Sequence, residues 1–523
     1  MMLLTAIFLI PLLAVLPAVA IPRIYGWLTR FIALLATFTS MVLSVYLLFT
    51  YDGATASPAG YKFDFNTTWV SLESIGLNIG YHVGVDGINL GLVVMGAIVA
   101  FAAACCSREI RSQEKEYYIL LLLMTGGILG AFVSLDLFLF YFFHELALVP
   151  TFIMIGLWGR GEKRTDAAFN ITVYLSFGAL IALIGLVMLY IQTGAQSFDI
   201  VELTAITQSN PIEVSTQGTI FALLMFGLGI LVSLWPFHTW APQGYAHAPT
   251  ATAMLHAGVL KKFGLYGLIR VAIPLAPKGA ATWLDVLALL CVGNIIYCGL
   301  VAIRQRDINY LIGTSSVAHM GFVFLGVASL TLIGMTGAVI LMVAHGLLAA
   351  LTFGLSGWIR SKTGTTEIDK LGGLLKQVPF IGTALIMAMM AGCGLPGFGN
   401  FVGEFMVLFG SWGTYPVITG LAIWGALIVG AVYMLRAIRN VAHGPLDEHH
   451  ARLRDADGLS RIAFSLLIAG LLVLGIYPRI LTDKIKPSVG KIVTITKAHE
   501  KEIKPSKAKT VAVNTAKSEG KNR

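Results

Sequence analysis

The stretch that decides the fold reads AGCGLPGFGNFVGEF and covers residues 391–405. It places Gly394, Pro396 and Gly397 inside a long apolar run, with Glu404 just beyond them. Glycine and proline interrupt a helix and free backbone polar groups, which lipid cannot satisfy. If this run crosses a membrane, the break must therefore lie inside the protein or beside a water-filled cavity.

A second break of the same kind lies at residues 231–242, which read LVSLWPFHTWAP and contain Pro236 and Pro242. Broken helices at corresponding positions of two halves are typical of transporters built from inverted repeats around a central ion path. The two breaks therefore predict such a repeat here. We expect five segments: three helices in 1–110, a first repeat (helices four to eight) in 111–275, a second repeat (helices nine to thirteen) in 276–442, helix fourteen in 443–483 and a Lys-rich tail in 484–523.

The composition indicates a membrane protein. The 523 residues are 57% hydrophobic and 12% charged, whereas a soluble domain has about 25% charged residues. Hydropathy windows predict about fourteen spans, so we expect an all-α polytopic membrane protein with breaks in helices seven and twelve. Residues 1–21 have no basic start and no clear cleavage site, and we interpret them as a retained first helix.

Basic residues alternate between the predicted loops. The loops after the odd-numbered spans one, three, five, nine, eleven and thirteen are rich in Arg and Lys, whereas the long loops 51–80 and 192–217 hold acidic residues instead. Because basic loops stay in the cytoplasm, we expect the amino terminus outside. The tail 484–523 lacks a packing pattern, and we expect it to be solvated and disordered, with contact to anionic lipid or a partner as the alternative.

Three charged residues fall inside apolar runs: Glu145, Lys262 and Glu404. Each costs at least about 2.5 kcal/mol to insert at the membrane centre, so a functional role is the first hypothesis. A buried carboxyl or amine can load and release a proton. Lys261 precedes Lys262, and adjacent helical residues point about 100° apart, so we favour Lys262 for the path and a structural role for Lys261. The alternative for Glu145 is a neutral acid bonded to a backbone carbonyl.

Imidazoles are candidates for the remaining proton path, because they titrate near neutral pH and can relay protons through either nitrogen. His319, with Ser315 one turn earlier, and His345 lie in apolar helices. A plain helix–helix hydrogen bond is the alternative for each. His238, His247 and His256 surround the first break and form, with Lys261, a secondary set.

The sequence offers no Walker loop, no dinucleotide-binding glycine motif and no cysteine array for a metal or cluster. The five cysteines are predicted to be small apolar packing residues. We therefore expect no cofactor, metal or nucleic acid on this chain.

Five strings resemble one family closely: SLWPFHTWAP (233–242), HAPTATAMLHAGVLKKFGLYGLIR (247–270), RDINYLIGTSSVAHMGF (306–322), AHGLLAALTFGLSG (344–357) and GLPGFGNFVGEF (394–405). They are similar to the antiporter-like subunits of proton-pumping NADH:quinone oxidoreductase, respiratory complex I. The glutamate at Glu404 resembles the M type, since related types usually carry lysine there.

The resemblance implies a proton-translocating, non-redox subunit in a bacterial plasma membrane, with a hydrophilic axis through Glu145, Lys262, His319, His345 and Glu404. It also implies L-like and N-like neighbouring subunits, and places NADH, flavin, iron–sulfur clusters and quinone on other subunits. A subunit of a multi-subunit cation/proton antiporter, or of a hydrogenase-type membrane complex, is the alternative.

Several positions depart from the family pattern. Leu231 stands where the family commonly has a lysine that pairs with the glutamate of span five, and Asn170 replaces another lysine. Gln243 and Tyr245 stand where an acid and a histidine are usual, and Asn309 where a base is usual. The resemblance therefore implies a divergent relative with an altered proton route.

Overall fold

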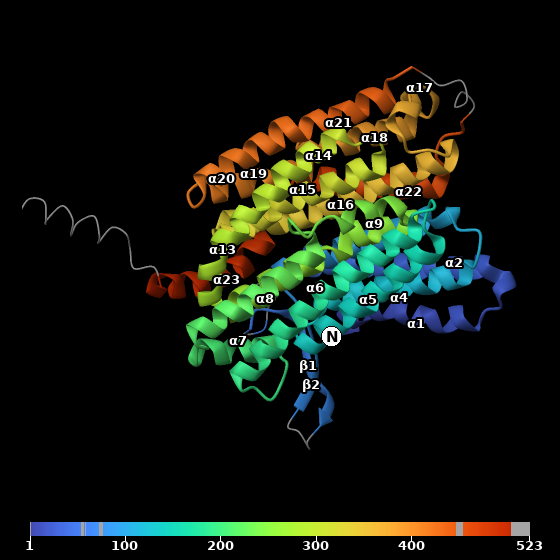
Figure 1. Cartoon of the computed structure of the whole chain (residues 1–523). Helices are drawn as coiled ribbons and strands as arrows, with labels where there is room; N and C mark the ends of the chain where they lie inside the picture. The colour runs from blue at the N-terminus through green and yellow to red at the C-terminus, as the bar shows by residue number, and fades with distance from the viewer. Residues whose placement is uncertain (1, 54–56, 58, 73–76, 446–452, 504–523) are drawn as a thin grey trace, which may run out of the picture.

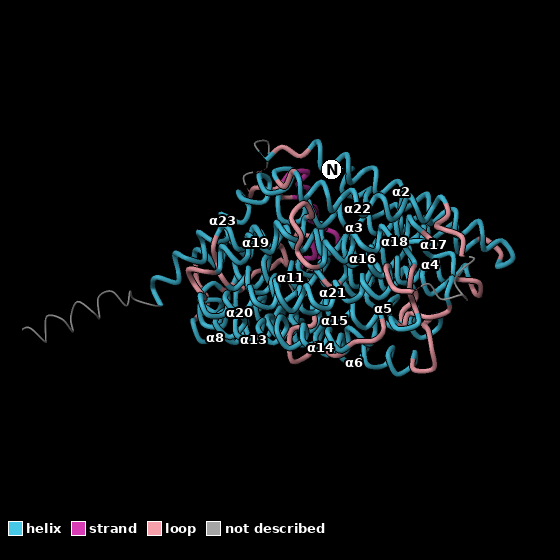
Figure 2. Tube along the Cα trace, turned by 90° about the horizontal axis from the view of Figure 1, so that it is seen from above, coloured by secondary structure: helices cyan, strands magenta, loops and turns pink. Residues whose placement is uncertain are grey.

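The helices of the chain lie side by side with roughly parallel axes, and a single β-hairpin projects from the bundle (Figure 1). The computed structural model describes the chain except for residues 1, 54–56, 58, 73–76, 446–452 and 504–523. Seen from above, the described residues are mostly helical, with loops at the ends of the helices and one pair of strands (Figure 2).

In the first part of the chain, helices α1 to α6 are long and α7 is short. Their bounds, with those of the hairpin, are α1 Met2–Ala20, α2 Gly26–Thr50, β1 Lys62–Leu72, β2 Leu77–Val85, α3 Gly87–Cys106, α4 Glu114–Val133, α5 Leu137–Trp158, α6 Arg164–Thr193, α7 Ile200–Ser209 and α8 Val214–Val232.

The middle of the chain is built from short helices and π-helical turns: α9 Trp240–His247, α10 Thr250–Leu255, η5 His256–Leu260, α11 Lys262–Gly267, η6 Leu268–Ala272 and α12 Ile273–Leu275. The remaining helices are α13 Pro277–Val292, η7 Gly293–Tyr297, α14 Cys298–Arg304, α15 Ile308–Ala328, α16 Leu332–Thr363, α17 Leu374–Gln377, α18 Pro379–Gly392, α19 Gly399–Ser411, α20 Pro416–Trp424, η9 Gly425–Gly430, α21 Ala431–Ala437, η10 Ile438–Ala442, α22 Gly458–Ile476 and α23 Arg479–Ile503.

Twelve helical segments among the described residues are long and apolar enough to cross a membrane. Two further spans, expected near residues 261 and 391, are divided into shorter helices, so the count of fourteen stays a prediction. Both expected breaks are present: α8 ends at Val232 before α9, and α18 ends at Gly392 before α19. The chain is an integral membrane protein of the predicted all-α class.

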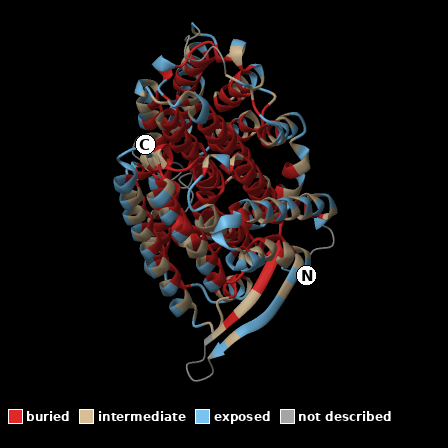
Figure 3. Cartoon of the chain, turned by 90° about the vertical axis from the view of Figure 1, so that its right-hand side faces the viewer, coloured by how far each residue is buried: buried red, intermediate tan, exposed pale blue. Residues whose placement is uncertain are grey.

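Helices α15 and α16 form the centre of the bundle, and the apolar stretch of each helix is completely buried. Buried residues fill the interior, whereas exposed residues lie on the outer helices (Figure 3). Small residues allow the central helices to approach closely: a Cβ on Gly403 of α19 would lie 2.7 Å from that of Leu341 of α16. The outer helices expose large apolar side chains, as membrane-facing helices do.

The same backbone bridge occurs once in each half of the chain. Asp136 caps the start of α5, and after α6 the chain returns to pair Asp199 with it in an antiparallel bridge. Asp307 caps α15, and after α16 the chain pairs Glu367 with it in the same way. Asp136 lies beside the hairpin, where it accepts from the Gly80 amide, whereas Asp307 follows the basic loop after α14. The matching connections at different ends of the bundle support an inverted repeat.

Two sequence expectations are wrong. The loop expected at 51–80 contains the β-hairpin, because residues 62–72 and 77–85 pair as antiparallel strands. The tail expected from residue 484 to be solvated and disordered continues as α23 to residue 503, and its apolar face, including Leu481, Ile485 and Val489, is buried. That face packs on α3, α13 and α16. Residues 504–523 lie outside the described part of the chain.

The hairpin is fastened by a histidine between two acids. His82 Nδ1 lies 2.5 Å from Asp199, and Nε2 lies 2.7 Å from Asp64. Burial of the ring opposes its charging, but the hydrogen bonds and charges of Asp199 and Asp64 outweigh burial, so the pKa of His82 is raised above its usual value. Asp136 lies close by, and burial raises its pKa to about 6.

This arrangement predicts a pH-dependent hairpin. Because the pKa of His82 is raised in the folded state, its stabilisation is complete below the unfolded pKa of about 6.5 and is lost as pH rises through the folded value. Hydrogen-exchange protection of β1 and β2, corrected for intrinsic exchange, should fall over that range. His82→Gln should remove this component, and an unchanged pH profile in His82→Gln would contradict the assignment.

Candidate functional site

Lys262 lies in the centre of the bundle, where a π-helical turn precedes it. The Lys261 amide donates to the His256 carbonyl five residues earlier, which is the π-helical pattern. The fully buried Lys262 ammonium donates to the Ala257 carbonyl at 2.7 Å and lies 3.0 Å from His345 Nδ1. The widened turn thus presents a carbonyl to a fully buried amine.

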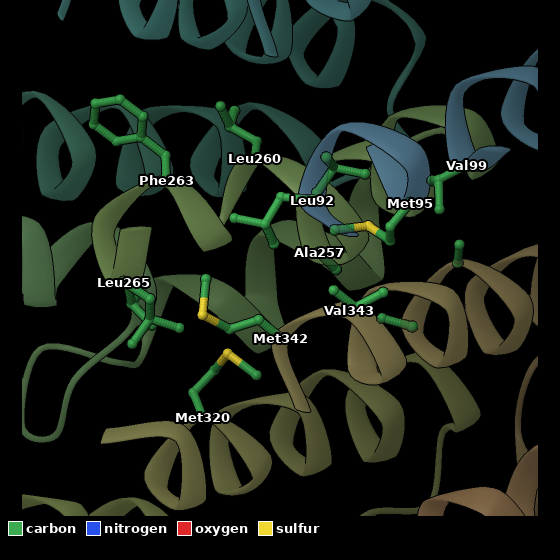
Figure 4. Close-up of a cluster of buried hydrophobic side chains, with 14 of the residues drawn as sticks. Leu92, Met95, Val99, Ala257, Leu260, Phe263, Leu265, Met320, Met342 and Val343 are labelled. Carbon is green, nitrogen blue, oxygen red and sulfur yellow. The ribbon is translucent and has the colours of Figure 1, made fainter. Parts of the chain in front are cut away.

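A shell of apolar side chains surrounds this part of the bundle. Leu92, Met95 and Val99 of α3 face Ala257, Leu260 and Phe263 of the broken span, with Met320, Met342 and Val343 on the other side (Figure 4). All are buried. Because the surroundings have a low dielectric constant, the charge of Lys262 depends on the few polar groups that reach it.

His319 and Glu404 continue the polar contacts from His345. The rings of His345 and His319 have centroids 5.4 Å apart. His319 Nε2 lies 3.5 Å from Glu404 Oε1 and 3.0 Å from the Gly392 carbonyl. The structure therefore brings four predicted residues into one buried series: Lys262, His345, His319 and Glu404.

His319 is held so that it can exist in two protonation states. Its Nδ1 lies 2.8 Å from the Ser315 carbonyl and 3.3 Å from the Ser315 hydroxyl. A neutral ring can donate through Nε2 and accept the hydroxyl proton at Nδ1, whereas a protonated ring can donate to both carbonyls. Tyr433 holds the Ser315 hydroxyl in place at 3.1 Å.

The second break places Glu404. Because α18 ends at Gly392, its carbonyl is free to accept from His319. Gly394 adopts φ +69°, and a Cβ there would lie 2.7 Å from Glu404 Oε2. A cavity of about 10 Å³, lined by His319, Glu404 and Tyr433, adjoins the break. That volume is about the space one water molecule needs.

The neighbouring Lys261 points elsewhere, as the helical spacing predicts. Its ammonium lies 3.3 Å from the Ser316 hydroxyl of α15 and 5.8 Å from the centre of the Tyr245 ring. Lys262 instead reaches α16 through His345. The two lysines therefore contact different helices, and only Lys262 joins the series to Glu404.

Glu145 is separated from this series. It lies on α5 and its side chain is 35% exposed in the isolated chain. Its ion-pair neighbour among the described residues is His144, whose Nδ1 is 3.5 Å away. His144 is almost completely buried and stacks on Phe263, the residue after Lys262, with ring centroids 4.0 Å apart.

Sequence reasoning missed His144 and Asn400. His144 was flanked by Glu145 in an apolar run, a signal that could have identified it. Asn400 lies one turn before Glu404 on α19, and its fully buried amide makes no hydrogen bond among the described residues. Buried polar groups without partners are rare, so both positions are further candidates for functional residues.

The secondary histidines divide into two groups. His256 is buried between the rings of Trp240 and Tyr245, with centroids about 5.5 Å away, and its Nδ1 has no hydrogen-bond partner among the described residues. His238 and His247 instead contact carbonyls of their own segment, at Pro236 and Gln243. The structure places His256 in the broken span, six residues before Lys262, and leaves the other two away from the series.

Neutral pairs occupy the positions that depart from the family pattern. The Asn170 amide donates to Gln243 at 3.0 Å, and the Ser356 hydroxyl donates to Asn309 at 2.7 Å. Leu231 is buried among apolar side chains. These side chains satisfy one another without charge.

The broken span is anchored at its other end by a buried ion pair. The Arg270 guanidinium donates two hydrogen bonds to Asp86, at 2.6 and 2.9 Å, and a third to the Tyr61 hydroxyl at 3.0 Å. Asp86 also caps α3 by accepting from the Ile88 amide. A two-pronged guanidinium contact fixes orientation as well as position, so this end of the span is rigid.

A family model described as NADH:quinone oxidoreductase/Mrp antiporter, transmembrane, matches residues 134–430, more than half of the chain. The chain belongs to this family. The matched region contains both breaks, Glu145 and the whole series from Lys262 to Glu404.

Relatives agree with this assignment along most of the chain. NADH-quinone oxidoreductase subunit M of Rickettsia felis is 34% identical over 461 residues, which cover 88% of this chain and 91% of that protein. F(420)H(2) dehydrogenase subunit M of Methanosarcina mazei is 34% identical over 447 residues, which cover 84% and 88%. The chain is therefore a subunit-M-like member of the family.

Solved structures show the same architecture. A chain of respiratory complex I from Thermus thermophilus superposes with a TM-score of 0.85 at 27% identity, covering 94% of this chain and 99% of that one. A chain of the Mrp complex from Dietzia shares the fold, with a TM-score of 0.78 at 20% identity.

The contact between Gly394 and Glu404 predicts a position-specific effect of a methyl group. Gly394→Ala and Gly397→Ala both place alanine at positive φ, and each should cost about 1–2 kcal/mol of stability. Only Gly394→Ala also displaces the Glu404 carboxylate, because nothing lies within 4 Å of a Cβ at Gly397. Proton transport by the assembled complex should therefore fall in Gly394→Ala and stay near normal in Gly397→Ala. Equal transport in the two would contradict a role for the position of Glu404.

Proposed function

We propose that this chain translocates protons in the membrane arm of an NADH:quinone oxidoreductase, coupled to quinone reduction elsewhere in the complex. The observation that carries the proposal is the series Lys262, His345, His319 and Glu404, which crosses the centre of a lipid-embedded bundle. Four titratable groups that follow one another in space are costly to bury in a membrane, and the packing of the helices does not require them.

The proton path in the second half starts from the Lys262 ammonium. Its proton can pass to His345 Nδ1 at 3.0 Å, which leaves a neutral amine held by the Ala257 carbonyl. The gap between the two imidazoles can be crossed by a water molecule or by ring rotation. His319 then delivers the proton towards Glu404, beside the cavity at the break.

In the first half, His144 takes the place of a charged partner for Glu145. Leu231 cannot carry a proton, and Glu145 makes no direct contact with Lys262 among the described residues. His144 is next to Glu145 and against Phe263, while His256 lies buried nearby in the broken span with a free ring nitrogen. We assign these two imidazoles to the link between Glu145 and Lys262.

The position of Glu145 supports a neighbouring subunit. A stripe of exposed apolar residues runs along α5 and consists of Phe138, Phe142, Val149, Ile153 and Leu157. Glu145 lies in the middle of this stripe. A carboxylate facing lipid at this depth is costly, so a partner surface that covers it is favoured. We propose L-like and N-like membrane-arm subunits as neighbours, in a bacterial plasma membrane with the amino terminus outside.

The chain itself carries no redox step in this proposal. NADH, flavin, iron–sulfur clusters and quinone belong to other subunits. A second electron donor is a candidate, because the relative named F(420)H(2) dehydrogenase subunit M is as similar as the relative from Rickettsia felis, at 34% identity. Quinone reduction by the purified complex with NADH or with reduced F420 distinguishes the two, and activity with F420 alone would reject the NADH assignment.

The two lysines provide the test of the path. Lys262→Ala should lower proton uptake into vesicles holding the assembled complex by about 100-fold, since it removes a group that transfers protons. Lys262→Arg should also fail, because guanidinium does not release its proton. Lys261→Ala is the matched control, equally buried but bonded to Ser316, and should retain more transport. Normal pumping by an assembled Lys262→Ala complex would reject the path.

A second test concerns Glu145 and His144. Glu145→Gln keeps the shape and removes the titration, so the complex should assemble but transport far fewer protons per electron. His144→Phe should give the same loss, because it preserves stacking on Phe263 and removes both ring nitrogens. If Glu145→Gln fails while His144→Phe pumps normally, the link runs through the neighbouring subunit instead.

A further inference from the structure

A basic cavity of about 840 Å³ opens at the end of the bundle that carries the basic loops. Seven basic and four acidic side chains line it, an excess of three positive charges. The cavity belongs neither to the buried series nor to either break, since none of those residues lines it. It therefore requires an explanation of its own.

Only part of the positive charge is neutralised within the chain. Arg108 pairs with Asp457, and Arg160 pairs with Glu109. A third acid, Asp455, accepts from the Phe380 amide, and the fourth, Glu114, lies in the first turn of α4. The remaining five cations make no side-chain hydrogen bond or ion pair with any described residue: Arg30, Arg111, Arg360, Lys362 and Arg454.

These five cations converge from separate segments. Arg30 lies on α2, Arg111 in the loop before α4, Arg360 and Lys362 in the last turn of α16, and Arg454 just before α22. Cations from four segments facing one space repel one another. The fold holds them there at a cost that a bound anion would remove, which points to an anion as the ligand.

The cavity lies at the level where the membrane ends. Helices α3 and α16 end at it, and α2 and α22 begin beside it. Trp27, near the start of α2, is 65% exposed, and exposed tryptophans are typical of the headgroup region. A cavity at this level is within reach of phospholipid headgroups.

Apolar side chains also form part of the cavity wall. Trp358, Phe464 and Ile110 line the cavity together with Cys105 and Cys106. A free inorganic anion gains nothing from such walls, whereas a phospholipid can place its glycerol and upper acyl carbons there and its phosphate among the guanidinium groups. Basic pockets between helices on the cytoplasmic side are known to suit anionic headgroups.

We propose that this cavity binds the headgroup of an anionic phospholipid, with its phosphate held by the five unpaired cations. The bound lipid joins α2, α16 and the start of α22, three elements that are far apart in sequence. The proposal is independent of the proton path.

The test compares two double variants of the full chain after delipidation. Arg111→Gln with Arg454→Gln removes two exposed cavity cations. Lys376→Gln with Arg439→Gln is the matched control, because both residues are exposed cations of predicted cytoplasmic loops outside the cavity. Bound lipid is counted by native mass spectrometry with phosphatidylglycerol, phosphatidylcholine or inorganic phosphate as the probe, and thermal unfolding checks that each variant is folded.

Phosphatidylglycerol should bind in preference to phosphatidylcholine. Its affinity should fall about 30-fold in the cavity variant, which corresponds to about fivefold per cation, and stay within about twofold in the control. Equal losses in the two variants would show general surface attraction and overturn the proposal. Phosphate binding that displaces no lipid, or release of a partner subunit by the cavity variant without loss of lipid, would also overturn it.

Discussion

A charged amine in the middle of a membrane must find its partners inside the protein, and the centre of this chain is arranged around that requirement. Lys262 is completely buried, with one carbonyl and one imidazole as its contacts. The carbonyl is supplied by the segment of the π-helical turn η5, and the imidazole by α16, one of the two central helices. A regular helix at η5 would aim the ammonium elsewhere, so the irregular backbone is part of the site.

The same logic explains which parts of the structure the sequence predicts. Glu404, Lys262 and the two glycine–proline breaks stand out because their cost in lipid can be read from residue type alone. The hairpin at 62–85 and the helix reaching residue 503 were misjudged, since both bury one face against partners that only the folded chain supplies. His144 was missed for a related reason: its role depends on Phe263, which comes from another helix.

The two halves are related in backbone but differ in polarity. In the second half, His345, His319 and Glu404 follow Lys262 at short separations. In the first half, the neutral pair of Asn170 and Gln243 takes the place of charged groups. A neutral pair is satisfied locally and does not respond to a charge arriving nearby, whereas imidazoles do. The first half therefore depends on fewer titratable groups.

The broken span is held more firmly at its Arg270 end than at Lys262. Arg270 and Asp86 fix the far end of the broken span to the start of α3 with two charge-assisted hydrogen bonds. Arg270 itself lies in a second π-helical turn, η6, and the short helix α11 connects this turn to Lys262. One end of the span is held firmly while the amine lies between two irregular turns. The Lys262 ammonium contacts its carbonyl and its imidazole at the same time, so a small local shift of the backbone would change the balance between the two contacts without breaking the Arg270–Asp86 pair.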